Sequence, residues 1–428
     1  MRYRIFAALL CGLAICATAF AQTPPRLTLA QAEQIALRNH PRIQSASLTA
    51  EAIKATVKQA RSAYYPQLSA NLTGVGAEPN STLAAGALTT STISSRLGTG
   101  VVVSQLITDF GRTGSLAATA QLRAEAQGQE VVNTRAQVLL NVEQAYYLSL
   151  GADQVLKVAQ ADLANRRLTL RQVQALAQSQ MKSTLDVSFA EVAVSQSELE
   201  QYNAENDVRA NRARLAAALG SQQDQTYELA EEPLPPPLEP AVDDLIARAL
   251  RDRPDLAAVS LNRDAEQRYA DAEKRLKYPT ISAMGVAGDI PAHDAPLRGT
   301  YSGAGLNLNV PILNGGLFAA RQSEAELRAQ AASKDVADLT VLIARDVRVA
   351  WLDANDAFQR LGVTARMVQE ADQALRLATL RYNAGLGSIV ELNQAQLNQT
   401  SAQIAAAAAK YDYLARRAAL DFATGALR

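Results

Sequence analysis

Two stretches of the chain, 112–180 and 317–383, place apolar residues at every third or fourth position, with Gln, Asn and Arg between them. This spacing predicts helices that each carry one narrow apolar stripe. Neither stretch contains proline, and glycine is rare in both. At 1.5 Å per residue each helix is about 100 Å long, well beyond the usual length of a helix in a globular domain.

A shorter helix is expected on each side of each long one. The expected ranges are 41–64 and 184–219 around the first, 254–278 and 388–424 around the second, and a short extra helix over 29–38. Pro41 and Pro254 suit the first helical position, where no N–H is needed. Gly220 and Gly425 follow the return helices and suit a left-handed helix end. Two shorter helices together nearly match one long helix, so the pattern predicts that they stack end to end beside it in an antiparallel rod.

Between the helices, apolar and polar residues alternate with a period of two, which predicts strands. One strand pair is expected over about 67–107, with its second strand at 97–107 and a Ser/Thr/Gly/Ala-rich loop at 76–96. The other is expected over about 280–310, with strands at 280–288 and 303–310 and a loop that carries Asp289, His293 and Asp294. Strands of about nine to eleven residues are long enough to cross a membrane when tilted. A soluble hairpin has the same periodicity, so both interpretations stay open here.

The two halves of the chain resemble each other. The segment 36–41 (ALRNHP) recurs 213 residues later as 249–254 (ALRDRP), and Asp186 meets Glu391 at an offset of 205. We therefore expect a two-fold internal repeat. Its predicted parts are repeat 1 over 22–220, a Pro-rich linker over 221–241 and repeat 2 over 242–428. The linker holds prolines at 233, 235, 236, 237 and 240, which favour an extended connection.

The first residues have the pattern of a secretory signal peptide. Arg2 and Arg4 precede an apolar run that ends in Ala19-Phe20-Ala21, which predicts cleavage after residue 21. Cys11 and Cys16, the two cysteines of the chain, both lie in the segment 1–21. The mature chain is thus expected to contain no cysteine. A permanent membrane anchor is the alternative, although the run is shorter than the roughly 20 residues that span a bilayer.

Composition excludes several classes of function. Lys plus Arg and Asp plus Glu both number 42, so nucleic acid is not an expected partner. With two His and two Cys, we expect no metal site, no cofactor and no cysteine-based catalysis. Ser179-x-x-Lys182 matches a motif of serine acyl enzymes, but its partner motifs are absent from the sequence and we attribute it to chance. The sequence does not indicate an enzyme.

Several short motifs occur in a characteristic order. They are the helix starts at Pro41 and Pro254, the Tyr-Pro strand entries at Pro66 and Pro279, and Tyr382-Asn383-Ala384-Gly385 followed by Ile389-Val390-Glu391. In this order the sequence resembles the TolC family of outer-membrane efflux and secretion channels over nearly the whole mature chain. The resemblance implies a mainly α fold with a membrane β-barrel. Three chains of four strands each form a 12-stranded barrel, continued by an α-helical coiled-coil barrel through the periplasm.

The resemblance also implies partners and a function. The chain is expected to be a homotrimer in outer-membrane lipid that meets a periplasmic adaptor protein and an inner-membrane transporter of RND, ABC or MFS type. It is then a passive exit duct, and the sequence leaves drug, metal and protein cargo open. A non-transporting coiled-coil protein that spaces the envelope is the alternative. It explains the long helices but not the four strands at matching points of a repeat.

Candidate site residues follow from the same resemblance. In the family, a Tyr and an Arg of the second hairpin bond an Asp of the first and close the tunnel. These positions fall on Tyr382, Gly387 and Asp186, so the Arg is missing and a looser lock is expected. Two acidic positions that ring the aperture fall on Glu391 and Gln394, which leaves one carboxylate per chain to attract cations. Adaptor docking is expected at two turns, Gln180, Met181, Lys182 and Ser183 in repeat 1 and Gly385, Leu386, Gly387 and Ser388 in repeat 2.

Overall fold

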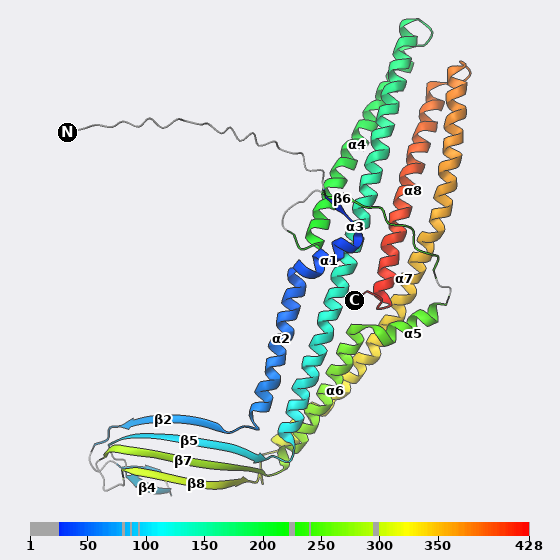
Figure 1. The fold of residues 1–428 in the computed structure, drawn as a ribbon. Coiled ribbons are helices and arrows are strands. Elements are labelled where there is room, and N and C mark those ends of the chain that lie inside the picture. Colours follow the sequence, from blue (N-terminus) through cyan, green and yellow to red (C-terminus); the bar gives the residue numbers. More distant parts are fainter. Residues whose placement is uncertain are drawn as a thin grey trace, which may run out of the picture.

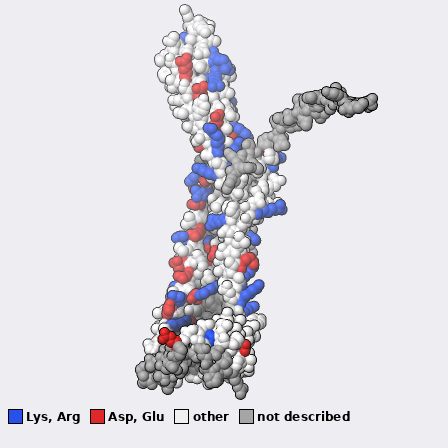
Figure 2. Space-filling view, turned by 90° about the vertical axis from the view of Figure 1, so that its left-hand side faces the viewer, with Lys and Arg blue, Asp and Glu red and all other residues white. Residues whose placement is uncertain are grey.

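The computed structural model describes residues 25–78, 82–85, 88–92, 95–221, 227–238, 241–293 and 299–427. The predicted signal peptide over 1–21 and the loop residue Asp294 lie outside these ranges. Two helices, α3 (Arg112–Gln178) and α7 (Leu317–Asn383), run along most of a long rod that carries a small sheet at one end (Figure 1). Figure 2 shows basic and acidic side chains interspersed along the face of the rod that it draws.

The shorter helices complete the rod. They are α1 (Leu29–Asn39), α2 (Pro41–Ser62), α4 (Thr184–Ala218), α5 (Val242–Asp252), α6 (Pro254–Lys274) and α8 (Ile389–Ala423). Helices α2 and α4 lie one beyond the other along α3, and α6 and α8 do the same along α7 (Figure 1). Helix α3 also packs against α6 and α8, which joins the two halves. The elements of the second half follow in the same order as those of the first.

Local sequence explains where the helices begin and end. The side chains of Ser183 and Ser388 accept hydrogen bonds from the backbone N–H groups of Asp186 and Glu391, which caps α4 and α8. Gly220 and Gly425 both have a φ of 76°, the left-handed conformation that favours glycine after a helix. The expected C-terminal signals therefore act where they were predicted.

The core is divided into clusters along the rod. One surrounds Tyr146 and Val142 of α3, and another surrounds Ile343 and Val347 of α7. A third lies near the tips and includes Tyr382. Many buried positions between the clusters are alanine, which lets the helices approach closely over the whole length.

The sheet contains four antiparallel strands in the order β2 (Gln67–Val75), β5 (Arg96–Thr108), β7 (Thr280–His293) and β8 (Thr300–Asn309). The strands β5 and β7 come from different halves and pair along most of their length. Strands β2 and β8 are therefore the two edges of the sheet in a single chain. Large apolar side chains on these edges, among them Leu72 and Leu306, are exposed.

The structure corrects several predicted boundaries. The loop expected at 76–96 contains a small hairpin of β3 (Thr82–Ala85) and β4 (Leu88–Thr92), whose small polar residues resemble a loop in sequence. Asp289 and His293, expected in a loop, belong to β7, because pairing with β5 extends that strand beyond residue 288. Strand β8 likewise begins at Thr300 instead of 303.

The helix expected over 254–278 ends at Lys274 and continues as a 3₁₀ turn over Arg275–Lys277. Tyr278 is extended, as expected for the residue before Pro279. The Arg275 side chain donates hydrogen bonds to the carbonyl oxygen of Gly111 and the hydroxyl of Ser115 at the start of α3. This helix end therefore also contacts the other half of the chain.

A parallel pair of two-residue strands, β1 (Arg26–Leu27) and β6 (Glu228–Leu229), was not predicted. The Tyr146 hydroxyl lies 2.9 Å from the carbonyl oxygen of Leu27 and 2.7 Å from that of Ala230, in donor range of both. Strands this short have no periodicity to detect. The buried tyrosine ties the start of repeat 1 to the linker region.

Candidate functional site at the helical tips

The two helix-to-helix turns lie near one another at the end of the rod remote from the sheet (Figure 1). In the first, the N–H of Met181 donates to the carbonyl oxygen of Leu176 at 2.9 Å, and in the second Leu386 donates to Arg381 at 2.8 Å. Gln180 and Gly385 occupy equivalent positions with φ of 56° and 74°. The turns therefore share one backbone form although their sequences differ.

The two turns differ in the strain that this form imposes. A left-handed conformation costs a non-glycine residue about 1 kcal/mol, and glycine nothing comparable. Gln180 bears that cost and Gly385 does not. The first turn contains no glycine, and this difference changes the energy of the turn but not its backbone shape.

An apolar cluster beneath the turns joins the two hairpins. Its buried members are Val173, Ala190, Tyr382, Ile389 and Leu392, which come from α3, α4, α7 and α8. Tyr382 is 5% exposed, and its hydroxyl makes no hydrogen bond to any described residue. Burial, and then the negative charge of Asp186, raise the pKa of the Tyr382 hydroxyl. The structure thus places these two predicted residues near each other.

Asp186 directs its hydrogen bonds elsewhere within the chain. Its carboxylate accepts from the backbone N–H of Ser183 at 3.1 Å and from the Ser183 hydroxyl at 3.2 Å. With the reciprocal bond from the Asp186 N–H, this forms a capping box at the start of α4. In a single chain, Asp186 is thus a helix cap that also acts on Tyr382 through its charge.

Lys182 makes a contact with Tyr382 that the sequence did not reveal. Its ammonium nitrogen lies 4.3 Å from the centre of the Tyr382 ring, within the range of a cation–π interaction. Lys182 belongs to the first turn and Tyr382 to the last turn of α7. The contact therefore links the tips of the two hairpins.

Glu391 and Gln394, the positions predicted to ring an aperture, both lie on the first turns of α8 and are exposed. Glu391 accepts a hydrogen bond from Arg381 Nε at 2.9 Å. Arg381 also donates to the carbonyl oxygen of Leu386 at 3.2 Å. Gln394 donates to the Asn398 side chain at 2.9 Å, one turn along the same helix. Arg381 belongs to no motif of the sequence, so its contact with Glu391 was not predicted.

Further from the tips, a cluster of polar side chains connects the two helical hairpins by hydrogen bonds. Asp162 of α3 accepts hydrogen bonds from Arg166 at 3.2 Å, from Thr400 of α8 at 2.8 Å and from Ser197 of α4. Arg166, Ser197 and Thr400 are all buried. Buried polar groups that satisfy one another in this way fix the relative position of the packed helices. This cluster could not be predicted from residue spacing along one helix, because its members come from three helices.

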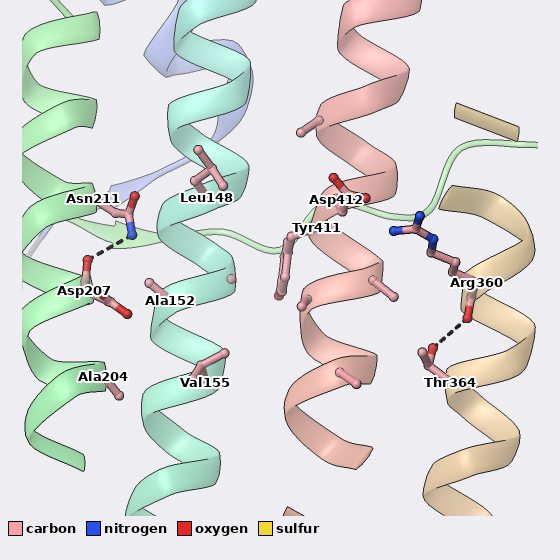
Figure 3. A pocket seen from close by; sticks show the side chains of 15 residues that line it. Leu148, Ala152, Val155, Ala204, Asp207, Asn211, Arg360, Thr364, Tyr411 and Asp412 are labelled. Atoms are coloured by element: carbon pink, nitrogen blue, oxygen red, sulfur yellow. Dashed lines mark hydrogen bonds between the residues drawn. The ribbon is translucent and has the colours of Figure 1, made fainter. Parts of the chain in front are cut away.

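A hollow of about 660 Å³ lies half-way along the rod, among α3, α4, α7 and α8 (Figure 3). Its wall includes six alanines together with Leu148, Val155 and Tyr411, and Arg360 and Asp412 lie at one side. Over the described part of the chain, no three His, Cys, Asp or Glu side chains are grouped so as to hold a metal ion. No described helix is both long and apolar enough to cross a bilayer.

A rod of very long helices with a four-stranded antiparallel sheet at one end is the architecture of outer-membrane channel proteins. The chain belongs to the outer membrane efflux protein family, whose model matches residues 33–221 and 245–426. It is therefore a transport channel of the outer membrane with its helical part in the periplasm, and not an enzyme. The resemblance to the TolC family is confirmed.

Individual proteins agree with this assignment. Protein CyaE of Bordetella pertussis is 28% identical over 389 residues, which cover 88% of this chain and 79% of CyaE. A membrane protein from Pseudomonas aeruginosa superposes with a TM-score of 0.81 at 22% identity, covering 93% of each chain. The outer membrane protein VceC of Vibrio cholerae superposes with a TM-score of 0.78 at 19% identity, covering 93% of this chain and 96% of VceC.

Proposed function

We propose that three copies of the chain form a homotrimer whose twelve strands close a barrel in the outer membrane. The helices then continue the barrel as a periplasmic tunnel, and the whole serves as the exit duct of a tripartite efflux or type I secretion system. The observation that carries the proposal is the four-stranded sheet with two free edges at the end of a rod about 100 Å long.

Closure of the sheet is geometrically simple. The four strands alternate in direction, so β8 of one copy runs antiparallel to β2 of the next. A ring of copies therefore continues the same ladder and leaves no unpaired edge, which a bilayer requires. Two copies would give eight strands, a barrel that side chains fill, whereas twelve leave a lumen.

The helical layer supports the same ring. Helix α4 exposes Leu185, Val192 and Leu199 at a spacing of seven residues, which is typical of a helix that packs in coiled-coil fashion. Helix α7 exposes Val349, Val363 and Leu377 at a spacing of fourteen, with Asp356 and Glu370 at the positions between them. Since α4 and α7 are the outer helices of the layer seen in Figure 3, the exposed apolar side chains of each can cover those of a neighbouring copy.

We further propose that the two halves are an internal repeat and that their tips dock a periplasmic adaptor. The docking residues are those of the turns, Gln180–Ser183 and Gly385–Ser388. An inner-membrane transporter of RND, ABC or MFS type would supply the cargo. Support comes from the position of both turns at the end of the rod, where all of these residues except the partly buried Lys182 and Gly387 are exposed, and from the family, whose channels work with adaptors and inner-membrane transporters.

The test is the native mass of the detergent-extracted mature protein, followed by single-channel conductance of the same sample in a planar bilayer. We expect a trimer with a small conductance that disappears after heat dissociation. A detergent-independent monomer or dimer without conductance would contradict the duct and favour an envelope-spacing coiled-coil protein.

A further inference from the structure

The charge at the tips differs from that of an acidic aperture. Residues 176–191 and 376–391 contain three basic side chains, Lys182, Arg376 and Arg381, and three acidic ones, Asp186, Glu191 and Glu391. The carboxylate of Asp186 is used in the capping box at the start of α4. Glu191 and Glu391 are exposed, and Arg381 lies directly against Glu391.

We propose that Arg381 sets the charge selectivity of the duct by neutralising Glu391, so that the closed tip does not act as a cation filter. The inference rests on the proposed function and names a residue that determines which cargo passes. Such a tip admits anionic and uncharged solutes as readily as cations, whereas a bare ring of carboxylates would concentrate cations.

The geometry fixes this pair in place. Arg381 Nε binds the Glu391 carboxylate at 2.9 Å while its Nη2 holds the carbonyl oxygen of Leu386 at 3.2 Å, so the guanidinium spans the turn. Both side chains are roughly half exposed, at 56% and 43%, so the pair contributes little to stability. Its effect is on the electric field at the tip.

The Arg381–Glu391 ion pair lies close to Gly387, where the absence of a side chain leaves room for it. A Cβ at position 387 would lie 3.2 Å from the Glu391 carboxylate and 3.3 Å from the Arg381 Cβ. A side chain there would therefore require the Glu391 carboxylate and its neighbours to shift by a few tenths of an ångström. Glycine at 387 and arginine at 381 therefore act together, and the cationic group is supplied from α7 instead of from the turn.

The test compares ion selectivity of the reconstituted wild-type channel with Arg381→Gln. One unit charge at about 6 Å in water changes the local concentration of a monovalent ion about threefold. We expect the wild type to show little cation preference and little block by lanthanum(III). Arg381→Gln should raise the cation-to-anion permeability ratio about threefold and add block by lanthanum(III).

Three variants separate charge from structure. Arg381→Lys keeps the charge and should behave as wild type, Glu391→Gln should shift selectivity towards anions, and the double variant Arg381→Gln/Glu391→Gln should return to wild type. A wild type that conducts, prefers cations and is blocked by lanthanum(III) as strongly as Arg381→Gln overturns the inference. A wild type that conducts nothing overturns the proposed function, and this inference with it.

Discussion

At the scale of single residues, Glu143 is an acidic group buried in the core of the rod. It is 7% exposed and lies among the apolar residues around Tyr146. Burial, and then the negative charges of Glu33 and Asp421, raise the pKa of the Glu143 carboxyl to about 8. A hydrogen bond between the Glu33 and Glu143 carboxyl groups adds to the effect. At neutral pH Glu143 therefore carries a proton in the folded protein.

This residue makes the stability of the rod depend on pH. Because the folded-state pKa lies above the ordinary 4.5, the contribution of Glu143 is full below about pH 4.5 and is lost as pH rises through about 8. The loss has a ceiling of about 4 to 5 kcal/mol per chain. Glu143→Gln cannot ionise and should not show this loss of stability. The variant should therefore melt at a higher temperature than wild type above pH 8 and at a similar temperature at pH 4.5.

The measurement is the melting temperature between pH 4.5 and 9 for both proteins. Glu51→Gln is the control, because Glu51 is exposed on α2 and paired with Lys54. Its curve should follow wild type throughout. Parallel curves for Glu143→Gln and wild type would show that Glu143 is ionised in the folded state at neutral pH.

At the scale of elements, the two hairpins are held together at their tips by Lys182 and the ring of Tyr382. The Tyr382 ring is buried and Lys182 is partly exposed, so the contact contributes at least as much as an exposed cation–π pair, about 0.5 to 1 kcal/mol, equivalent to about a two- to fivefold change in an equilibrium. Lys182→Met should therefore raise the open probability of the channel by about that factor. Tyr382→Phe keeps the ring and should leave it unchanged, as the hydroxyl binds no described residue.

Single-channel recordings of the two variants check this prediction. The family pattern predicts the opposite for Tyr382→Phe, because there the hydroxyl is part of the lock with Asp186. If Tyr382→Phe opens the channel while Lys182→Met does not, the Tyr382 hydroxyl, and not the contact of its ring with Lys182, keeps the channel closed.

The elements themselves could be predicted well from the sequence, and their contacts could not. The range 317–383 matches α7 because a long apolar stripe, a glycine before it and a glycine after it are all local signals. The hairpin β3–β4 was missed because Thr, Ser and Ala suit a loop equally well. Arg381 and the Lys182–Tyr382 contact depend on side chains ten and 200 residues apart, which no periodicity reports.

At the scale of the whole molecule, a single chain has an unpaired sheet edge and exposed apolar helix residues on each of two opposite sides. The sheet ends in β2 on one side and β8 on the other, and the helical layer exposes apolar side chains on α4 and α7. Surfaces that differ on the two sides form head-to-tail contacts, which give a ring when the rotation between copies closes and an open filament when it does not. The halves are joined internally by β5–β7 and by α3 with α6 and α8, so each chain enters such a ring as one unit.

The most direct test of this account is disulfide cross-linking between β2 and β8. The expected mature chain has no cysteine, since Cys11 and Cys16 lie in the segment 1–21. Asn71→Cys on β2 is combined with one cysteine at a time at 303–307 on β8, and the oxidised products are separated under denaturing conditions. We predict that one register gives a covalent ladder that stops at three chains and that neither cysteine alone cross-links. Dimers from a single cysteine, or a ladder that continues beyond three, would contradict a closed trimeric duct.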